Sequence, residues 1–251
     1  MNRKQSLIFS FVRILSTLLR LVPTRAAAGF LVNLVKVLVA SRPARDALRL
    51  CFLVDRGVYD ISGAQACRYG NGVHTKHRHT GYHDFFVKRL AAGDKVIDIG
   101  CGDGSLTFDM ADRAGAHVTG IELSEASYRK ALERSGHSRV RYLHGDALTD
   151  LPGESFDVAV LSNVLEHIEE RVGFLQSVRK ALSPARFLIR VPAYDRDWRV
   201  PLMQELGMDY RLDKTHHIEY TRESFSNELA RAGLQIDHME FRWGEIWCEA
   251  H

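Results

Sequence analysis

The sequence predicts an α/β fold: a doubly wound, Rossmann-like sheet of seven mostly parallel strands, preceded by a helical extension at the N-terminus. Two observations predict it. From residue 84 onward, short apolar segments rich in β-branched residues alternate with segments of helical period. A glycine-rich turn at residues 100–104 joins the first of these strands to a helix, an arrangement typical of open parallel sheets. The 251 residues suffice for one such domain and an appended segment.

The predicted strands are short and apolar, as expected of strands that are covered on both faces. They occupy residues 95–99, 117–122, 140–144, 156–162, 187–191, 234–240 and 245–249. The predicted helices of this part of the chain occupy residues 84–90, 105–114, 124–135, 169–182 and 223–232. Ser124 and Thr221 are expected to cap two of them, because a hydroxyl oxygen accepts a hydrogen bond from a free N–H group of the first turn.

The turn after the first strand is a candidate ligand site. Asp98 lies near the end of the strand Lys95–Ile99, and Gly100, Gly102 and Gly104 follow at every second position. Glycine lacks a Cβ, so the backbone can adopt positive φ and approach a ligand closely. The free N–H groups at the start of the next helix suit a carboxylate or a phosphate. The alternative is a tight turn that binds nothing.

Residues 1–60 are predicted to form a basic, amphipathic helical extension. The first 50 residues hold nine Lys or Arg against one acid, whereas the rest of the chain holds 25 basic and 30 acidic residues. Apolar helices are expected at residues 7–22 and 30–40, and a third helix at residues 43–55. Neither apolar helix reaches the roughly 20 residues that cross a bilayer.

A basic stripe beside a broad apolar face suits an anionic membrane, so residues 6–40 are predicted to lie on such a surface. The alternative is a helical cap that packs on the rest of the chain or on a second copy of it, as in a homodimer. A secretory signal is disfavoured because Arg13 and Arg20 interrupt the apolar stretch. The four cysteines are scattered, which indicates a reducing, cytoplasmic location, here at the inner face of the membrane.

Residues 61–83 are predicted to form a histidine-rich loop that covers or contacts a substrate. The stretch is polar, cationic and punctuated by glycine, with little helical or strand period. Lys76 and Arg78 suit an anionic group of a substrate. The four histidines of this stretch lack the spacing of a metal site and no cysteine joins them, so no metal is assigned.

Motifs after the glycine turn narrow the ligand. The turn has G-x-G-x-G spacing with an acid two residues before the first glycine, unlike the G-x-G-x-x-G of dinucleotide sites. Glu122 ends the second strand, where a carboxylate can accept hydrogen bonds from both hydroxyls of a ribose. Gly145-Asp146-Ala147 follows the third strand, and S-N-V-L-E-H-I at residues 162–168 ends the fourth. In this order the motifs of residues 84–250 resemble class I S-adenosylmethionine-dependent methyltransferases of type 11/23.

The resemblance implies S-adenosylmethionine as the cofactor, bound where the parallel strands end. The residues that it assigns to the cofactor are Asp98, Gly100, Cys101, Gly102, Gly104, Glu122, Leu123, Asp146, Ala147 and Asn163. In the family, the aspartate that matches Asp146 hydrogen-bonds the adenine amino group. The strand end that matches residues 162–168 faces the methionine part of the cofactor and the reacting methyl group.

Two histidines are candidates for the chemistry. His167 is predicted to act as general base toward an acceptor hydroxyl; a role in bracing the next helix is the alternative. The domain carries a predicted substrate-pocket insert at residues 193–221, with a D-x-T-H stretch that in the family lies beside the substrate. His216 matches the histidine of that stretch. The insert residues assigned to substrate binding are Tyr194, Asp213 and His217.

The acceptor is suggested by a second resemblance. The segment before the glycine turn resembles methyltransferases of cell-surface polysaccharide and glycolipid synthesis, which implies O-methylation of a saccharide or a lipid-linked glycan. The alternatives are a small-molecule or quinone-type acceptor and a module that binds the cofactor without catalysis. The glycine spacing disfavours a nicotinamide-linked dehydrogenase. Nucleic acid is disfavoured as a partner, because the basic segment is strongly apolar and few aromatic residues lie among its cations.

Overall fold

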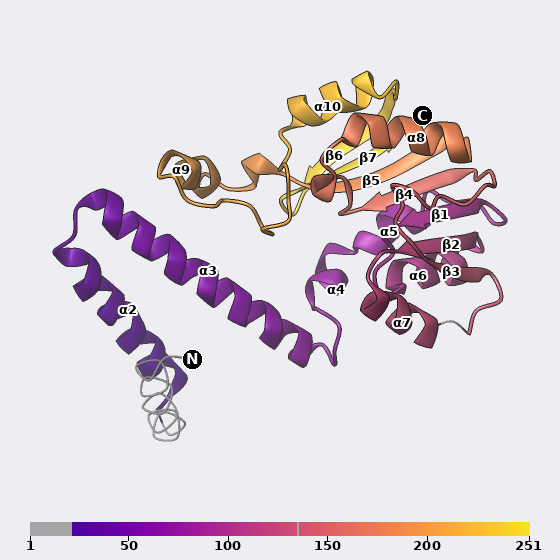
Figure 1. Ribbon diagram of the computed structural model, residues 1–251. Coiled ribbons are helices and arrows are strands. Elements are labelled where there is room, and N and C mark those ends of the chain that lie inside the picture. Colours follow the sequence, from indigo (N-terminus) through magenta and orange to yellow (C-terminus); the bar gives the residue numbers. More distant parts are fainter. Residues whose placement is uncertain (1–21, 135) are drawn as a thin grey trace. The chain divides into compact units, whose positions relative to one another are not determined.

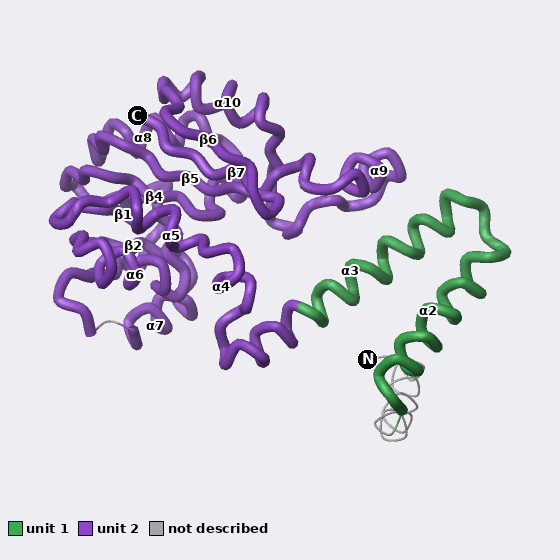
Figure 2. Tube along the Cα trace, turned by 180° about the vertical axis from the view of Figure 1, so that it is seen from behind, with its two compact units in different colours: residues 1–62 green, residues 63–251 purple. Residues whose placement is uncertain are grey.

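The computed structural model describes residues 22–134 and 136–251, and the chain divides into two compact units, residues 1–62 and 63–251 (Figure 2). The boundary falls within the helix α3, Ala44–Tyr69. The helix predicted at residues 7–22 lies outside the described residues, apart from Val22. Within the two described ranges, no helix combines the length and the apolar character needed to cross a bilayer.

The described part of the first unit is helical. The helix α2 spans Thr24–Ala40 and includes the segment predicted at residues 30–40. Pro43 precedes α3, in agreement with the fixed φ of proline, which suits the start of a helix. None of the 17 residues of α2 is buried, so its apolar side chains stay in contact with solvent.

The second unit is built on one seven-stranded sheet (Figure 1). Its strands are β1 Lys95–Ile99, β2 His117–Glu122, β3 Val140–His144, β4 Val158–Ser162, β5 Arg186–Pro192, β6 Ile236–Arg242 and β7 Glu245–Ala250. They lie in the order β3-β2-β1-β4-β5-β7-β6, with every pair up to β5 parallel and β7 antiparallel to both neighbours. This confirms the predicted doubly wound sheet. The strand order reverses between β1 and β4, the point at which such sheets bind ligands.

Helices cover both faces of this sheet (Figure 1). The helices that follow α3 are α4 Lys76–Thr80, α5 Tyr82–Val87, α6 Ser105–Ala114, α7 Glu125–Glu133, α8 Arg171–Leu182, α9 Arg199–Glu205 and α10 Arg222–Arg231, with short 3-10 turns at Leu165–His167 and Tyr194–Arg196. Of these, α5, α6, α8 and α10 contribute to the buried clusters on the sheet, whereas α9 lies away from it (Figure 1). Both predicted helix caps are confirmed. Ser124 Oγ accepts a hydrogen bond from the N–H of Ser127, and Thr221 Oγ1 accepts one from the N–H of Ser224.

Alternation along the strands divides the core into two layers. One buried cluster joins the sheet to α5 and α6, and its members include Val96, Val158, Leu188, Phe86 and Met110. The other joins the opposite face to α8 and α10, and its members include Ile97, Ala159, Ile189, Leu175 and Leu229. Residues at even positions of β1, β4 and β5 therefore project toward α5 and α6.

Three polar residues share this face where their strands end. Asp98 on β1, Ser162 on β4 and Arg190 on β5 are each in phase with the valines and leucine that face α5 and α6. Ser162 pairs with Arg190 in register across the β4–β5 ladder. The alternation that builds the core thus places a carboxyl, a hydroxyl and a guanidinium side by side at one edge of the sheet.

The expectation of a loop at residues 61–83 is wrong, because helical turns fill much of this stretch. α3 continues to Tyr69, past its predicted end at residue 55, and α4 and α5 follow. Gly81 separates α4 from α5 with a φ of 57°. α5 begins two residues earlier than predicted and buries Phe85 and Phe86 against the sheet, a tertiary contact that local periodicity does not reveal.

Candidate active site

The glycine turn between β1 and α6 holds its backbone at positive φ. The φ angles are 69° at Gly100, 58° at Gly102 and 74° at Gly104, in the region that residues with a Cβ rarely adopt. A Cβ at Gly104 would lie 2.2 Å from the hydroxyl of Tyr142, whereas a Cβ at Gly102 would meet no described atom within 4 Å. Packing therefore requires glycine at position 104, and the space beside Gly102 can receive a ligand.

The carboxylate of Glu122 holds this turn. Its Oε2 accepts a hydrogen bond from the backbone N–H of Gly102 at 2.9 Å, and its Oε1 accepts one from the N–H of Ser124 at 2.7 Å. The parallel pairing of β2 with β1 brings the end of β2 beside the turn. Each carboxylate oxygen can accept a second hydrogen bond, so the ribose role assigned to Glu122 is open to it and stays a prediction.

Asp98 is a buried acid at the end of β1. Its side chain is 1% exposed, and its Oδ2 accepts a hydrogen bond from Thr107 Oγ1 at 2.6 Å. Burial raises the pKa of Asp98 to about 7, and the nearby charge of Glu122 acts in the same direction. A buried carboxyl group that ionises near neutral pH is suited to a cationic ligand, because such a ligand would compensate its charge.

A cleft of about 790 Å³ opens beside Asp98, within the usual size range of small-ligand sites. The predicted cofactor residues that line it are Asp98, Gly100, Cys101 and Gly102. Ser162 and Arg190 line it from the ends of β4 and β5. The segment before β1 contributes His74, His77, Arg78 and Tyr82. Of the two cations predicted to meet an anionic substrate, Arg78 lines this cleft and Lys76 does not.

The other residues assigned to the cofactor follow the same edge of the sheet outside this cleft. Leu123 is exposed after β2. Asp146 follows β3, and its Oδ1 accepts a hydrogen bond from the N–H of Leu148 at 2.9 Å, while Ala147 packs against the core. Asn163 follows β4 with a φ of 59°. The order of these residues matches a ligand extended across the ends of β1, β2 and β3, and their roles stay predictions.

A second group of polar residues joins the end of β4 to the insert at residues 193–221. The rings of His167 and His216 meet edge to face, with centroids 4.7 Å apart. His167 Nδ1 lies 2.9 Å from Thr215 Oγ1, which donates to Asp213 Oδ1 at 2.8 Å. Because that hydroxyl proton is used toward Asp213, we assign the donor role to Nδ1–H of His167, which leaves Nε2 to accept a proton. Desolvation and the neighbouring His216 lower the pKa of His167, so the ring is neutral near pH 7.

Glu166 lies buried beside this pair of histidines. Its Oε1 accepts a hydrogen bond from Asn163 Nδ2 at 2.8 Å, whereas its Oε2 has no hydrogen-bond partner in the described ranges. Burial raises the pKa of Glu166 to about 7. Ligand atoms of Glu166, His167 and His216 lie within 4.8 Å of one another, so these side chains form a set that could hold a metal ion, although the sequence analysis assigned none.

The two remaining insert residues behave differently. Tyr194 donates from its hydroxyl to Gln204 in α9, and its ring contacts Tyr210, away from the histidine pair. His217 donates its backbone N–H to the carbonyl of Glu166 at 2.7 Å, which ties the insert to the end of β4. The structure thus brings the predicted residues His167, Asp213 and His216 together, and Tyr194 belongs to a separate contact.

Arg190 and Tyr82 line the cleft but are absent from the site predicted by sequence. Arg190 donates a hydrogen bond to Asn163, which in turn reaches Glu166, so it connects the cleft to the histidine group. The sequence pattern could have indicated Arg190, because it alternates in phase with the residues on the face of Asp98 and lies near the carboxyl end of its strand. Tyr82 carries no such signal, because its position depends on how α5 packs.

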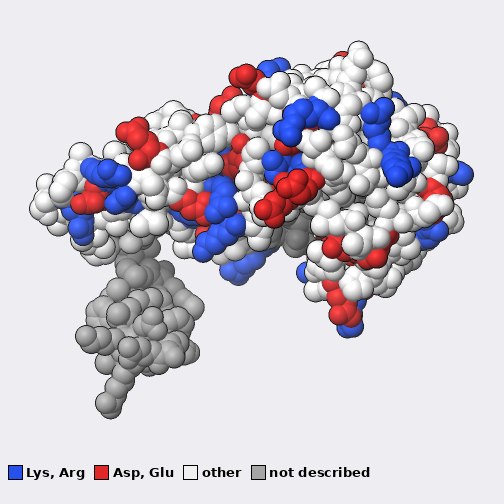
Figure 3. Space-filling model, turned by 45° about the horizontal axis from the view of Figure 1, so that its top comes forward, with Lys and Arg blue, Asp and Glu red and all other residues white. Residues whose placement is uncertain are grey.

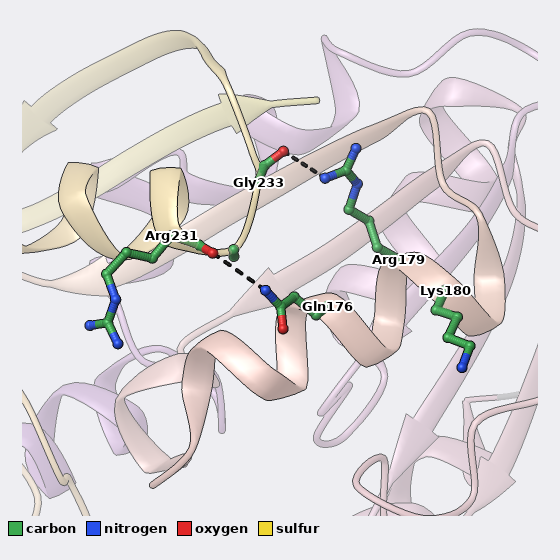
Figure 4. Close-up of a pocket in the computed structure, with 6 residues that line it drawn as sticks. Gln176, Arg179, Lys180, Arg231 and Gly233 are labelled. Atoms are coloured by element: carbon green, nitrogen blue, oxygen red, sulfur yellow. Dashed lines mark hydrogen bonds between the residues drawn. The ribbon is translucent and has the colours of Figure 1, made fainter.

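A second hollow, of about 490 Å³, lies between α8 and the turn that follows α10 (Figure 4). Arg179 donates to the carbonyl of Gly233 at 2.6 Å, and Gln176 donates to the carbonyl of Arg231 at 3.4 Å. The charged ends of Arg179, Lys180 and Arg231 point in different directions, so they do not converge on a common ligand (Figure 4). This hollow is distinct from the cleft beside Asp98 and contains none of the predicted site residues.

Comparison with known proteins places these features in a family. A family model described as a methyltransferase domain matches residues 74–239. The ubiquinone biosynthesis O-methyltransferase of Cupriavidus pinatubonensis is 32% identical over 158 residues, which are 59% of this chain and 63% of that protein. The protein of the same name from Aromatoleum aromaticum is 35% identical over 159 residues, or 57% of this chain and 65% of that one.

Solved structures share the fold. Magnesium protoporphyrin IX methyltransferase of Synechocystis PCC 6803, determined with bound SAH, is 19% identical with a TM-score of 0.58, covering 79% of this chain and 98% of that one. An S-adenosylmethionine-dependent methyltransferase of Mesorhizobium loti is 22% identical with a TM-score of 0.53, covering 66% and 94%. The chain spans less than two thirds of the length of the two curated relatives above. Because the family model matches well over half of its residues, this chain belongs to the methyltransferase domain family.

Proposed function

We propose that this protein transfers a methyl group from S-adenosylmethionine to a hydroxyl oxygen of a small aromatic, quinone-type acceptor. The observation that carries the proposal is the cleft beside Asp98, where bare backbone and a buried acid meet at the ends of β1 and β4. The two curated relatives, both named ubiquinone biosynthesis O-methyltransferases, support this acceptor class. The methyltransferase domain family supports the reaction type.

The residues of the cleft, and Glu122 beside it, fit this cofactor. Gly102 leaves open space beside its Cα, so an adenosyl group can approach the main chain. Glu122 offers carboxylate oxygens to a ribose from a position fixed by Gly102 and Ser124. Asp98 offers a buried carboxylate to a cationic group, which would keep the acid ionised.

When bound, S-adenosylmethionine supplies a methyl group already activated on a sulfonium, so the protein chiefly positions the acceptor. Attack by the acceptor oxygen forms an O–C bond while the S–C bond breaks, and the hydroxyl proton must leave. Nε2 of His167 is the proposed base, since Thr215 and Asp213 orient the ring through Nδ1. His216 packs against this ring and is the second candidate.

A saccharide or lipid-linked glycan is the other candidate acceptor. Its only support is the resemblance of the segment before the glycine turn to methyltransferases of polysaccharide and glycolipid synthesis. Neither curated relative reported above bears a name of that class, so the quinone-type acceptor stands first. On the face drawn in Figure 3, basic and acidic side chains are interspersed, and we do not propose nucleic acid as an acceptor.

Two measurements test the proposed activity. Isothermal titration with S-adenosylhomocysteine should show binding with one site per chain. Incubation with tritiated S-adenosylmethionine should then label a catechol or a hydroquinone, with a product 14 daltons heavier. Binding without transfer to catechols, hydroquinones or extracted glycolipids would identify a non-catalytic module. A folded protein that binds neither cofactor form would refute the proposal.

We also propose that α2 rests on an anionic membrane surface, within an extension that runs to about residue 60. Its exposed apolar side chains include Phe30, Leu31, Val32, Leu34, Val37 and Leu38. Residues 22–45 carry Arg25, Lys36, Arg42 and Arg45 and no acid. Exposed apolar area of this extent, combined with one sign of charge, is typical of interfacial helices.

Vesicle flotation tests this surface. The full chain should float with vesicles containing phosphatidylglycerol and stay behind with phosphatidylcholine alone. Replacing Phe30 and Val37 together by Asp should abolish flotation, whereas Leu148→Asp, at an exposed apolar residue of the second unit, should not. If the chain does not float but forms a dimer, and the Phe30/Val37 variant does not, then the apolar face of α2 binds a second copy of the chain instead of a membrane.

A further inference from the structure

Arg190 is a buried cation that faces the cleft. It lies near the end of β5, opposite Ser162 in the strand ladder, and is 8% exposed. It lines the same cleft as Asp98, on the same face of the sheet. A guanidinium so far removed from water is costly unless an anion or several acceptors compensate it.

Aromatic rings fix the guanidinium in place. Its Cζ lies 4.2 Å from the ring centroid of Tyr82 and 5.3 Å from that of Trp247. Both rings are largely buried, and the cation packs over their faces. The structure thus builds a rigid guanidinium, the form that recognises planar anions best.

The protein itself satisfies only part of this group. Nη2 donates to Asn163 Oδ1, and Nη1 lies 3.7 Å from Glu245 Oε2, beyond hydrogen-bond distance. Nε is buried and has no hydrogen-bond partner among residues 22–134 and 136–251. A guanidinium has five N–H donors, so most of the hydrogen-bonding capacity of Arg190 is left for another acceptor.

The cleft carries charged side chains of both signs. Arg78 lines it together with Arg190, and so does His77, whose pKa burial lowers to about 4, so that its ring is neutral near pH 7. Asp98 supplies a carboxylate to the same cleft from β1, two strands away in the sheet. A ligand with a carboxylate at one end and a cationic centre at the other would satisfy both groups.

We propose that Arg190 binds a carboxylate of a ligand in this cleft, which makes the site selective for carboxylate-bearing molecules. The inference rests on the proposed methyl transfer, and the carboxylate has two possible sources. One is the amino-acid end of the cofactor. The other is an acid group on the ring of the aromatic acceptor that carries the hydroxyl to be methylated.

Equilibrium binding to Arg190→Gln distinguishes the sources. S-adenosylhomocysteine and 5′-methylthioadenosine differ in the amino-acid end, and 3,4-dihydroxybenzoate and catechol differ only in the carboxylate. If Arg190 holds the cofactor, the variant should bind S-adenosylhomocysteine about 10- to 100-fold more weakly and 5′-methylthioadenosine unchanged. If it holds the acceptor, the same loss should fall on 3,4-dihydroxybenzoate, titrated with S-adenosylhomocysteine present, and spare catechol.

Matched variants keep this test independent of folding. Arg186→Gln removes an arginine of the same strand that pairs with Glu249 and Asp94, and should leave all four affinities unchanged. If the single variant fails to fold, Arg190→Gln combined with Glu245→Gln replaces it, because this double variant removes both charges of the buried pair. It should show the same selective loss of affinity for ligands with a carboxylate. Arg190→Lys should restore part of the lost affinity.

Two results would overturn the inference. A folded Arg190→Gln that retains all four affinities within twofold would show that no carboxylate meets Arg190. An equal loss for ligands with and without a carboxylate would assign Arg190 to packing. Failure of the unaltered protein to bind S-adenosylhomocysteine at all would instead refute the proposed function, so the two failures are distinct.

Discussion

Glu122 Oε2 accepts a hydrogen bond of 2.9 Å from the N–H of Gly102, which links the end of β2 to the glycine turn after β1. The other oxygen of the same carboxylate accepts one of 2.7 Å from the N–H of Ser124. Two donors on two strand ends are therefore satisfied by one acceptor group. This arrangement holds both the turn and the carboxylate in place before a ligand arrives, so less ordering is required on binding.

Glu122→Gln tests whether this carboxylate orders the cofactor site. The glutamine side chain would turn its NH₂ group toward one of the two backbone N–H groups, so that two donors face each other. The remaining hydrogen bond would no longer be strengthened by the carboxylate charge. We expect the affinity for S-adenosylhomocysteine, measured by isothermal titration, to fall about 10- to 100-fold. Glu125→Gln, at an exposed residue paired with Arg129, should retain full affinity. Equal affinities in the two variants would remove Glu122 from the site.

Alanine at Gly104 should chiefly lower stability, whereas alanine at Gly102 should chiefly lower cofactor affinity. Both positions have positive φ, so alanine costs about 1 kcal/mol of stability at either through the backbone alone. At Gly104 the new Cβ also collides with the hydroxyl of Tyr142, and we expect several kcal/mol in total, measured by urea unfolding. At Gly102 the Cβ enters open space, so cofactor affinity should fall with little further loss of stability.

Tyr142→Phe provides the control for that collision. It removes the hydroxyl oxygen, the nearest atom that the alanine at position 104 would strike, together with its hydrogen bond of 3.1 Å to the Gly104 carbonyl; the ring carbons Cζ and Cε1, at 2.7 and 2.9 Å from the new Cβ, remain. Stability lost in Gly104→Ala should be partly recovered in the double variant, because the ring can then shift. Purely additive losses would mean that backbone strain or the remaining ring carbons, rather than the tyrosine hydroxyl, set the requirement for glycine.

The local pattern predicted the parallel half of the sheet almost residue for residue. β1, β2, β3 and α6 begin and end where the sequence placed them, because β-branched runs bounded by polar or glycine residues encode a buried strand locally. The loop predicted before α5 was wrong, because α3 continues to Tyr69 and α4 follows it. The helix predicted at residues 84–90 is present as α5, with its bounds shifted toward the N-terminus. α9 was not anticipated in the insert, where Pro201 stands in the first turn and is tolerated there.

The residues of the candidate site likewise fall into those that local sequence predicts and those that only tertiary contacts bring together. Asp98 and the glycines could be predicted from the sequence, because backbone geometry at a strand-to-helix turn restricts which residues fit. The link from Asp213 through Thr215 to His167 joins segments 48 residues apart and depends on how the insert folds back. The aromatic setting of Arg190 likewise needs α5 and β7 to meet at β5, a tertiary fact without a local signal.

Asp98 should make the free protein less stable as pH rises from about 4 to 7. Burial raises the pKa of Asp98 from 3.8 to about 7. Between these values the unfolded chain has released the proton and the folded chain retains it, so the free energy of unfolding decreases with pH. The penalty is complete above pH 7 and is at most about 4 kcal/mol.

Asp98→Asn should remove the part of the pH-dependent decrease in unfolding free energy that Asp98 causes. The asparagine keeps an acceptor for the Thr107 hydroxyl. Unfolding by urea at pH 5 and pH 8 should show a smaller loss in the variant than in the unaltered protein. A residual decline is expected, because burial raises the pKa of Glu166 to about 7 as well. Identical pH dependence in both proteins would contradict an Asp98 that stays protonated when folded.

His167 should govern the pH dependence of methyl transfer. The base acts only when neutral, and its lowered pKa places the acidic limb of the kcat profile below the usual value of about 6.5. His167→Ala should lower kcat about 10²- to 10⁴-fold and leave S-adenosylhomocysteine affinity unchanged, since this residue does not line the cleft. His238→Ala, at an exposed histidine of β6, serves as the control.

Asp213→Asn separates a base from a histidine that only braces the fold. The carboxylate of Asp213 raises the pKa of His167 through space and accepts the Thr215 proton, so its loss should lower that pKa further. The acidic limb of kcat should then move to lower pH, while the plateau falls because Thr215 no longer fixes the tautomer of the ring. A merely structural His167 would lower the plateau in both variants and leave the position of the limb where it was.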